Sequence, residues 1–215
     1  MSRLVLASAS PRRRELLARL RLPFDIRPVD IDERPGRSRN PEIVARRLAR
    51  EKAEAARLVD ENAPILAADT VVAPAGTLLG KPRDAEEATS MLQALRGRTH
   101  DVVTGIALIP ESSRTSIARQ PVTRVTMRDY ADEEIAASIA RGDPFDKAGG
   151  YAIQDSLLRP VARYEGCYCN VVGLSLWATI ECLRKAGMGV ELPRVDFLPE
   201  CASCPLAPAL PQIAY

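Results

Sequence analysis

The most unusual acid in the sequence is Asp69, which lies within the apolar run ILAADTVV. A buried carboxylate is costly unless it is paired, bound to a metal, or placed where its strand faces a cleft. Thr70, Val71 and Val72 continue the strand-like pattern, which disfavours a simple turn. Because His100 is the only histidine, His-based triads and multi-histidine zinc sites are disfavoured. If the protein is an enzyme, its base is therefore expected to be a carboxylate, and we expect Asp69 to lie in a functional site; an aspartate in a turn is the alternative.

Three arginines, Arg12, Arg13 and Arg14, stand at the start of an expected helix. A helix N-terminus already carries partial positive charge from its free amides, so acids are preferred there. A serine-rich turn before such a terminus is, however, typical of an anion site. Ser8 and Ser10 add hydroxyl donors, and arginine forks match phosphate oxygens. We therefore expect an anion from outside the chain to bind here, with Arg14 solvated; three solvated arginines are the alternative.

Another acid and two lysines could join this site if the fold brings them to a phosphate. Glu33 is the last acid of the segment VDIDER, which by itself reads as a solvated loop. Lys52 is expected on the polar side of a helix, and Lys81 lies in a stiff Gly-Lys-Pro turn. Isolated lysines are usually solvated, so only a nearby phosphate makes either one functional.

The segment DPFDKAGGYAIQD places polar side chains around two glycines, which let a backbone approach a ligand closely. Asp146, Lys147 and Tyr151 flank the glycines. Gln154 carries an amide with both donor and acceptor, as reading a nucleobase edge requires. Gln154 is therefore a candidate base-reading residue.

Four of the five cysteines form two close pairs. Cys201 and Cys204 are spaced as half of a zinc site, and Cys167 and Cys169, on one face of an expected strand, could supply the other half. An odd cysteine count without a secretory signal favours reduced thiols. Ordinary free thiols are therefore the preferred interpretation.

The composition is that of a globular protein and limits the classes of partner. The 215 residues are 46% hydrophobic and 27% charged, with a net charge of +2. This balance disfavours a dedicated nucleic-acid binder. No apolar run approaches the roughly 18 residues of a membrane span, and the apolar stretch after Met1 is too short for a signal peptide. We expect a cytoplasmic protein with no membrane partner.

Apolar patterning alternates between strand-like and helix-like stretches, which predicts an α/β fold: a mixed, twisted sheet with flanking helices. From residue 193 onward five of the 17 prolines occur without periodicity, so we divide the chain into a domain over 1–190 and a proline-rich tail over 191–215. Helices are expected from residue 11 and over 40–59, 84–97, 132–141 and 175–186, and extended segments over 4–7, 24–33, 63–73, 100–109, 122–130, 151–155 and, as a hairpin, 160–173.

Seven stretches in order resemble the signatures of the Maf family of nucleoside triphosphate pyrophosphatases. They are LASASPRRRELL, DERP, REKAEAA, AADTVV, LGKP, DKAGGYAIQ and NVVGL, and they span residues 4–187. The resemblance implies an α/β fold with two lobes around a cleft, as in inosine triphosphatases, and a homodimer. It also implies hydrolysis of a nucleoside triphosphate between its α and β phosphates with Mg²⁺ or Mn²⁺.

The resemblance also assigns roles to residues of this chain. Asp69 matches the proton acceptor, and Glu33 matches another active-site position. In the mechanism that we expect from these matches, Asp69 and Glu33 would hold the metal together with the phosphates. Lys52 and Lys81 match further catalytic positions that stabilise developing charge. Arg12, Thr70 and Gln154 match the three positions that separate the dTTP/UTP branch from the 7-methyl-GTP branch. In the mechanism that we expect, Arg12 or Arg13 holds the phosphates at the N-terminus of the first helix, where Ser8 and Ser10 add hydroxyl donors.

One departure concerns base selectivity. The dTTP/UTP branch usually reads Tyr-Gly-Ile-Gln-Gly, whereas this chain has Ala152 and Asp155 in place of the two glycines. Hydrolysis of dTTP, UTP or a modified pyrimidine nucleotide is the preferred function. The alternatives are 7-methyl-GTP hydrolysis, broad triphosphate hydrolysis, and a non-enzymatic role in septum formation.

Overall fold

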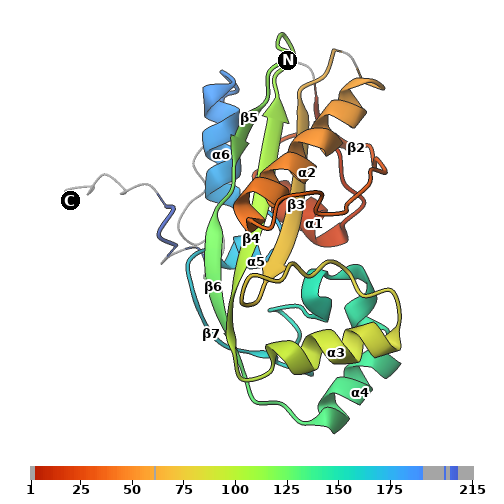
Figure 1. The fold of residues 1–215 in the computed structure, drawn as a ribbon. Helices are drawn as coiled ribbons and strands as arrows, with labels where there is room; N and C mark the ends of the chain where they lie inside the picture. The colour runs from red at the N-terminus through yellow and green to blue at the C-terminus, as the bar shows by residue number, and fades with distance from the viewer. Residues whose placement is uncertain (1–2, 61, 191–200, 202–203, 208–215) are drawn as a thin grey trace, which may run out of the picture.

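The computed structural model describes residues 3–60, 62–190, 201 and 204–207. Its centre is one mixed sheet of seven strands in the order β2-β1-β3-β4-β6-β7, with β5 paired to β4 (Figure 1). The expected mixed α/β architecture is confirmed. The strands are β1 (Leu4–Leu6), β2 (Phe24–Ile26), β3 (Ile65–Ala73), β4 (Thr99–Ile109), β5 (Ile117–Arg119), β6 (Val122–Met127) and β7 (Val161–Glu165).

Helices supply the crossovers and cover the sheet. β1 runs parallel to both β2 and β3, whereas every other pairing is antiparallel. Parallel neighbours need a crossover, and α1 and α2 provide the two in this chain. The helices are α1 (Pro11–Ala18), α2 (Pro41–Arg57), α3 (Ala85–Leu95), α4 (Asp132–Ala140), α5 (Tyr168–Val172) and α6 (Leu176–Lys185), with short 3₁₀ turns η1 (Asp143–Asp146) and η2 (Ala148–Gly150).

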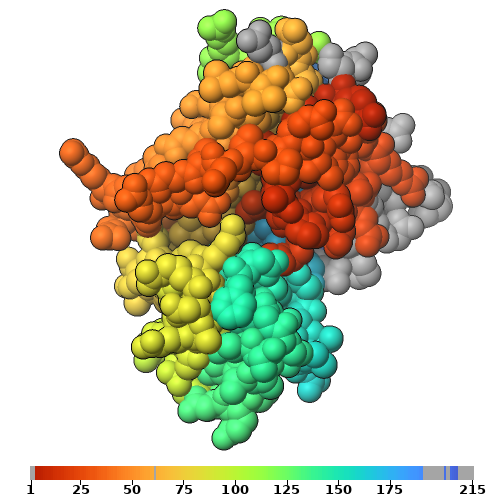
Figure 2. All heavy atoms as spheres, turned by 90° about the vertical axis from the view of Figure 1, so that its right-hand side faces the viewer, coloured from red at the N-terminus to blue at the C-terminus, as the bar shows by residue number. Residues whose placement is uncertain are grey.

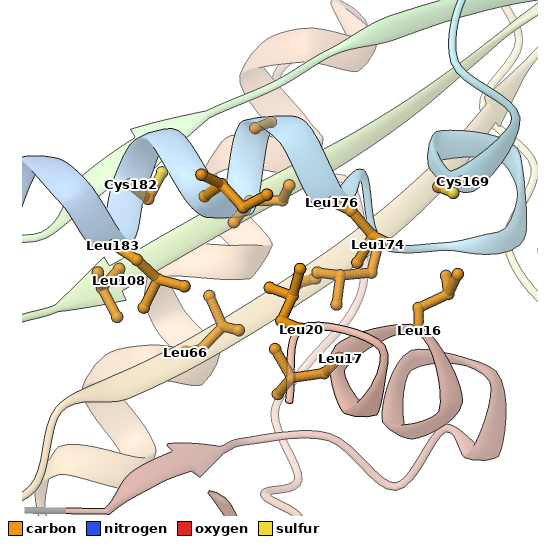
Figure 3. Packing of buried hydrophobic residues seen from close by; sticks show 14 of the residues in the cluster. Leu16, Leu17, Leu20, Leu66, Leu108, Cys169, Leu174, Leu176, Cys182 and Leu183 are labelled. Atoms are coloured by element: carbon orange, nitrogen blue, oxygen red, sulfur yellow. The ribbon is translucent and has the colours of Figure 1, made fainter. Parts of the chain in front are cut away.

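Alternation along β3 divides the core between the two faces of the sheet. Leu66 and Ala68 belong to the cluster that contains α1, α5 and α6, part of which is seen in Figure 3. Ile65 and Ala67 belong to a second cluster, which α2 covers with small alanines such as Ala49. The upper lobe is therefore a sheet with helices on both faces.

A smaller lobe lies where β3 and β4 continue past α2 (Figure 1). There α3, α4, η1 and η2 gather around a third apolar cluster that includes Leu92, Val125 and Tyr130. Because β3 passes from one lobe to the other, residues in its second half lie at the junction. The expected two-lobed arrangement is confirmed.

Three expectations about extended segments were wrong. β2 ends at Ile26, so most of residues 24–33 is loop. Residues 151–155 form a turn, in which Oδ1 of Asp155 accepts from the backbone N–H groups of Leu157 and Leu158. The second arm of the expected hairpin is the short helix α5, because the buried Asn170 side chain must turn inward to reach β4 and β6.

The expected C-terminal tail lies largely outside the described residues. Cys201 and Cys204 are described, however, and both are buried in the core cluster of α1, α5 and α6. In the described part of the chain, no helix has the length and apolar character needed to cross a bilayer.

Candidate active site

A cavity of about 620 Å³ lies between the two lobes. Figure 2 views the side where the N-terminal segments of the upper lobe, in red and orange, meet the yellow and blue-green segments of the lower lobe. The cavity brings together segments far apart in the sequence. All ten predicted site residues line it: Ser8, Ser10, Arg12, Arg13, Glu33, Lys52, Asp69, Thr70, Lys81 and Gln154.

Asp69, Lys52 and Glu33 form one connected group at the centre of the cavity. Lys52 Nζ donates to Oδ1 of Asp69 and, at 2.6 Å, to Oε1 of Glu33. Asp69 and Lys52 are each only 7% exposed. The ammonium group of Lys52 thus holds the carboxylates of Asp69 and Glu33 close to each other.

The position of Lys52 differs from the expected one. It lies on the buried face of α2, where Ala49, Ala53 and Ala56 pack on the sheet. Small alanines let α2 sit close to β3, and the long Lys52 side chain then reaches Asp69. The expectation that Lys52 lies on the polar face of its helix was wrong. The spacing of residues within one helix gives no information about a carboxylate on the neighbouring strand, and it is this carboxylate that pairs with Lys52.

Glu33 is held in its charged form by the two lysines. Partial burial raises the pKa of this carboxyl, but the hydrogen bond and charge of Lys52 and the charge of Lys81 more than offset it. The net result is a pKa of Glu33 below its usual value. Lys81 Nζ lies 3.5 Å from Oε2 of Glu33, and its side chain is 54% exposed. Glu33 therefore links the buried group to an exposed cation.

Arg13 binds three groups of the chain itself. Its Nε donates to the carbonyl of Gly173 at 2.9 Å, Nη2 to Oγ1 of Thr70 at 3.0 Å, and Nη1 to Oγ of Ser8 at 3.4 Å. Burial lowers the pKa of Arg13, and the charges of Asp69 and Glu33 oppose that effect. The expectation that these arginines find their partner only outside the chain was wrong for Arg13.

Arg12 bridges the two lobes. Its Nη1 donates to Oδ2 of Asp146 at 2.7 Å and its Nη2 to the carbonyl of the same residue at 3.1 Å. Asp146 also accepts from Lys147 Nζ at 2.6 Å. Arg12 therefore also has partners in the chain, whereas Arg14 is exposed, as expected.

A polar network behind Thr70 was not predicted from the sequence. Oγ1 of Thr70 lies 2.9 Å from Oγ1 of Thr104, which in turn donates to the carbonyl of Asn170. The Asn170 amide oxygen accepts from the backbone N–H of Thr104. A fully buried asparagine inside the NVVGL stretch was the available signal, because a buried amide must find several partners. The network fixes the hydroxyl of Thr70 at the cavity wall.

Ala152 and Asp155, the two residues that depart from the usual branch pattern, differ in their position relative to the cavity. Ala152 lines the cavity beside Gln154, whereas Asp155 is not among its lining residues. The Asp155 side chain instead accepts hydrogen bonds from the following turn. The extra acid therefore lies outside the cavity wall.

The carboxylates suit a hard cation only in combination with a bound phosphate. Within the part of the chain that is described, no three histidine, cysteine or acidic side chains are grouped to hold a metal ion. Mg²⁺ is commonly held by one or two carboxylates together with substrate phosphates. Asp69 and Glu33, which share Lys52, match that donor set.

A family model described as "Maf-like protein" matches residues 3–186. The chain belongs to the Maf family. A relative named dTTP/UTP pyrophosphatase from Thermomicrobium roseum is 56% identical over 208 residues, covering 96% of this chain and 94% of its own length. A protein of the same name from Myxococcus xanthus is 51% identical over 185 residues, covering 86% and 93%.

The C-terminal segment of this Maf protein lies beyond the matched family region, which ends at residue 186. Because the T. roseum alignment covers 96% of the chain, it extends into the segment that carries Cys201 and Cys204. Among solved structures, a HAM1 protein from Coxiella burnetii aligns with a TM-score of 0.42 and 22% identity, over 60% of this chain and 75% of its own.

Proposed function

We propose that this Maf protein hydrolyses dTTP and UTP between the α and β phosphates, giving the nucleoside monophosphate and pyrophosphate. It is a hydrolase acting on phosphoric anhydrides. The observation that carries the proposal is the group of Asp69, Lys52 and Glu33 in the cavity between the lobes. The names of its relatives, which share up to 56% of its residues, support the same reaction and substrates.

Asp69 acts as the general base in this scheme. The oxygen of a water molecule bonds to the α-phosphorus while the bond from that phosphorus to the α–β bridging oxygen breaks. Asp69 takes the proton of the water, and the bond electrons leave with pyrophosphate. Lys52 holds Oδ1 of Asp69, so we assign the proton to Oδ2. A carboxylate base needs no histidine, consistent with a sequence that has only one.

The lysines oppose the negative charge that develops in the transition state. Lys52 lies deepest, beside Asp69, and we assign it to the α-phosphate. Lys81 is exposed on the opposite side of Glu33, and we assign it to the leaving pyrophosphate. Asp69 and Glu33 would hold Mg²⁺ or Mn²⁺ together with the phosphates, and such an ion neutralises phosphate charge when bound.

The N-terminal turn binds the triphosphate in this scheme. The hydroxyls of Ser8 and Ser10 line the cavity beside the N-terminus of α1, which favours anions. Arg12 reaches the phosphates when it leaves Asp146. Arg13 positions Ser8 and Thr70, to which it is already bonded.

Base selectivity is assigned to Arg12, Thr70 and Gln154. Gln154 is exposed at the cavity rim, so its amide is available to a nucleobase edge. Thr70 is fixed by Arg13 and Thr104. The homodimer and the cytoplasmic location remain predictions.

Hydrolysis in ¹⁸O-labelled water tests the position of bond cleavage. With dTTP and Mg²⁺, we expect the label in dTMP and unlabelled pyrophosphate. Label in pyrophosphate, or a nucleoside diphosphate product, would contradict attack at the α-phosphorus. Parallel assays with UTP, CTP and 7-methyl-GTP test the branch: comparable turnover of purine and pyrimidine nucleotides would contradict the assigned selectivity.

A further inference from the structure

Four of the five cysteines meet in the core of the upper lobe, behind the proposed active site. Cys167 and Cys169 lie at the start of α5, and Cys201 and Cys204 come from the C-terminal segment. All four are buried, at 0–7% exposed, in the cluster that joins α1, α5 and α6. Two segments separated by about thirty residues in the sequence thus contribute a pair of thiols each.

The sulfurs are in direct contact with one another. Sγ of Cys169 lies 3.2 Å from Sγ of Cys201. The side chains of Cys169 and Cys204 both interact with the sulfur of Cys167. The contacts therefore form an unbroken path from Cys201 through Cys169 and Cys167 to Cys204.

Backbone and hydroxyl groups also point at these sulfurs. The N–H of Asn170 donates to the sulfur of Cys167, and the N–H of Leu206 donates to that of Cys204. Oγ of Ser175 lies 3.4 Å from Sγ of Cys167. Backbone N–H groups directed at a sulfur stabilise its thiolate form, which is the form that binds metals.

The fifth cysteine shows that the grouping does not extend to every buried thiol. Cys182 is fully buried on α6 in the same cluster. Figure 3 shows it well away from Cys169, toward the other end of the helix. Burial raises the pKa of its thiol to about 11, and the charged groups that act on it are Arg119, Glu181 and Lys185, on β5 and α6.

We propose that Cys167, Cys169, Cys201 and Cys204 bind one Zn²⁺ ion in a closed, tetrahedral structural site. Four sulfur ligands with no open position are typical of structural zinc, and soft thiolates favour zinc over hard cations such as Mg²⁺. The CxxC spacing of the C-terminal pair is that of common zinc-binding turns, and the backbone N–H of Cys204 donates to the carbonyl of Cys201 within this turn.

The cluster must expand slightly to take the ion. Two sulfurs on a tetrahedral zinc with bonds of about 2.3 Å lie about 3.8 Å apart. The sulfurs of Cys169 and Cys201 are closer than that, at 3.2 Å, and as they stand no three such side chains in the described ranges are spaced around a metal position. Small rotations of the cysteine side chains provide the difference. Each thiol loses its proton as its bond to zinc forms, so binding releases protons.

Such a site would fasten the C-terminal segment to the wall of the active site. α5 carries Asn170, which holds Thr104, and ends at Gly173, whose carbonyl accepts from Arg13. Zinc would anchor the first turn of α5 and so the backbone behind these contacts. Cys167 and Cys169 lie within the matched family region, whereas Cys201 and Cys204 lie beyond its end at residue 186, so the proposed site would join the C-terminal segment to the Maf fold.

Metal content and cobalt spectra of the full chain test the proposal without any nucleotide, so the result is independent of the proposed reaction. Purified without chelators, the wild-type protein is expected to contain one zinc per chain. Replacement by Co²⁺ is expected to give the intense thiolate-to-cobalt absorption and visible bands of a tetrahedral sulfur site. This spectrum uses the wild-type chain and does not depend on any variant folding.

Two variants locate the ion. The double variant Cys201→Ser/Cys204→Ser is expected to lose the zinc and the cobalt spectrum, whereas Cys182→Ser, which removes an equally buried thiol, is expected to keep both. The proposal is overturned if the wild type holds no zinc and gives no thiolate bands with Co²⁺, or if the double variant keeps one zinc. It is also overturned if the thiols of the purified protein are paired as disulfides.

Discussion

The centre of the proposed active site is one ammonium shared by two carboxylates. Asp69 and Glu33 would repel each other if Lys52 were absent, and Asp69 lies almost wholly away from water. Lys52 is therefore required to keep the two carboxylates together. Lys81 has the same charge and also contacts Glu33, but it lies in solvent.

Replacing each lysine in turn distinguishes the effect of the buried ion pair of Lys52 from that of the exposed ion pair of Lys81. We expect Lys52→Met to lower the free energy of unfolding by about 3 kcal/mol, because it leaves a buried carboxylate unpaired. Lys81→Met is expected to change it by less than about 1 kcal/mol, as exposed ion pairs contribute little. Both variants should hydrolyse dTTP more slowly. Denaturant unfolding and steady-state kinetics provide the two readouts, and equal stability losses in the two variants would contradict the buried pairing.

The buried His100 is expected to make the free energy of unfolding fall at acid pH. The side chain is 3% exposed, its Nε2 lies 2.7 Å from the hydroxyl of Tyr151, and burial lowers its pKa to about 4. The unfolded chain, with a pKa near 6.5, therefore binds the proton first as the pH falls. We expect this residue to remove about 2–3 kcal/mol of stability between pH 6.5 and pH 4.5.

The measurement is the unfolding free energy at several pH values for the wild type and His100→Gln. Glutamine cannot titrate, and its amide can still meet the Tyr151 hydroxyl. The variant should lose less stability than the wild type as the pH falls through this window. Parallel curves for the two proteins would show that His100 is not buried in its neutral form.

At the scale of elements, the packing of α2 on β4 determines whether Lys52 reaches Asp69. Gly105 of β4 pairs with Asp69 of β3, and a Cβ atom at Gly105 would lie 2.0 Å from the carbonyl oxygen of Ala45 on α2. Neither backbone can yield without moving its element. The glycine thus allows α2 to approach the sheet at the level of Asp69.

Gly105→Ala should therefore displace α2. We expect a loss of about 3 kcal/mol or more in unfolding free energy, as overpacking against backbone is severe. Hydrolysis should also fall, because Lys52 moves with the helix. Gly189→Ala is the control, since a Cβ there meets no atom within 4 Å. A wild-type melting temperature for Gly105→Ala would contradict the close packing.

Elements with a clear period were the predictable part of this fold. The helix over residues 40–59 and the strand over 63–73 were found from their patterns because their apolar spacing is regular, and α2 and β3 confirm them. α5 was missed because CYCNVVG alternates like a strand, while the turn that forms depends on Asn170 reaching β4 and β6. The partner of Arg12 could not be predicted either, because Asp146 lies 134 residues further along the chain and only the fold brings the two together.

At the scale of the whole molecule, the cleft between the lobes is bridged by Arg12 and Asp146. The pair joins the N-terminus of α1 in the upper lobe to η1 in the lower lobe. Lys147 and Arg12 together hold the pKa of the Asp146 carboxyl below its usual value, although its partial burial acts the other way. The carboxylate of Asp146 is thus bound to the guanidinium of Arg12, which in the proposed function binds a substrate phosphate.

Removing the carboxylate should therefore favour the ligand. We expect Asp146→Asn to bind pyrophosphate severalfold more tightly, because Arg12 no longer has to leave a charged partner. Asp143→Asn is the matched control: it removes an equal charge from the same lobe, but that carboxylate pairs with Arg141. Inhibition of dTTP hydrolysis by pyrophosphate measures the affinity. Equal or weaker inhibition of Asp146→Asn than of the control would contradict competition for Arg12.

The most direct test of the catalytic assignment is pyrophosphate release from dTTP, with Mg²⁺, by the wild type and Asp69→Asn. Asparagine keeps the size of the side chain and an oxygen for Lys52, but it cannot accept the proton of the attacking water. We predict a turnover roughly 10²- to 10⁴-fold below that of the wild type, the usual contribution of a general base. Turnover close to that of the wild type would contradict the assignment of Asp69 as the base.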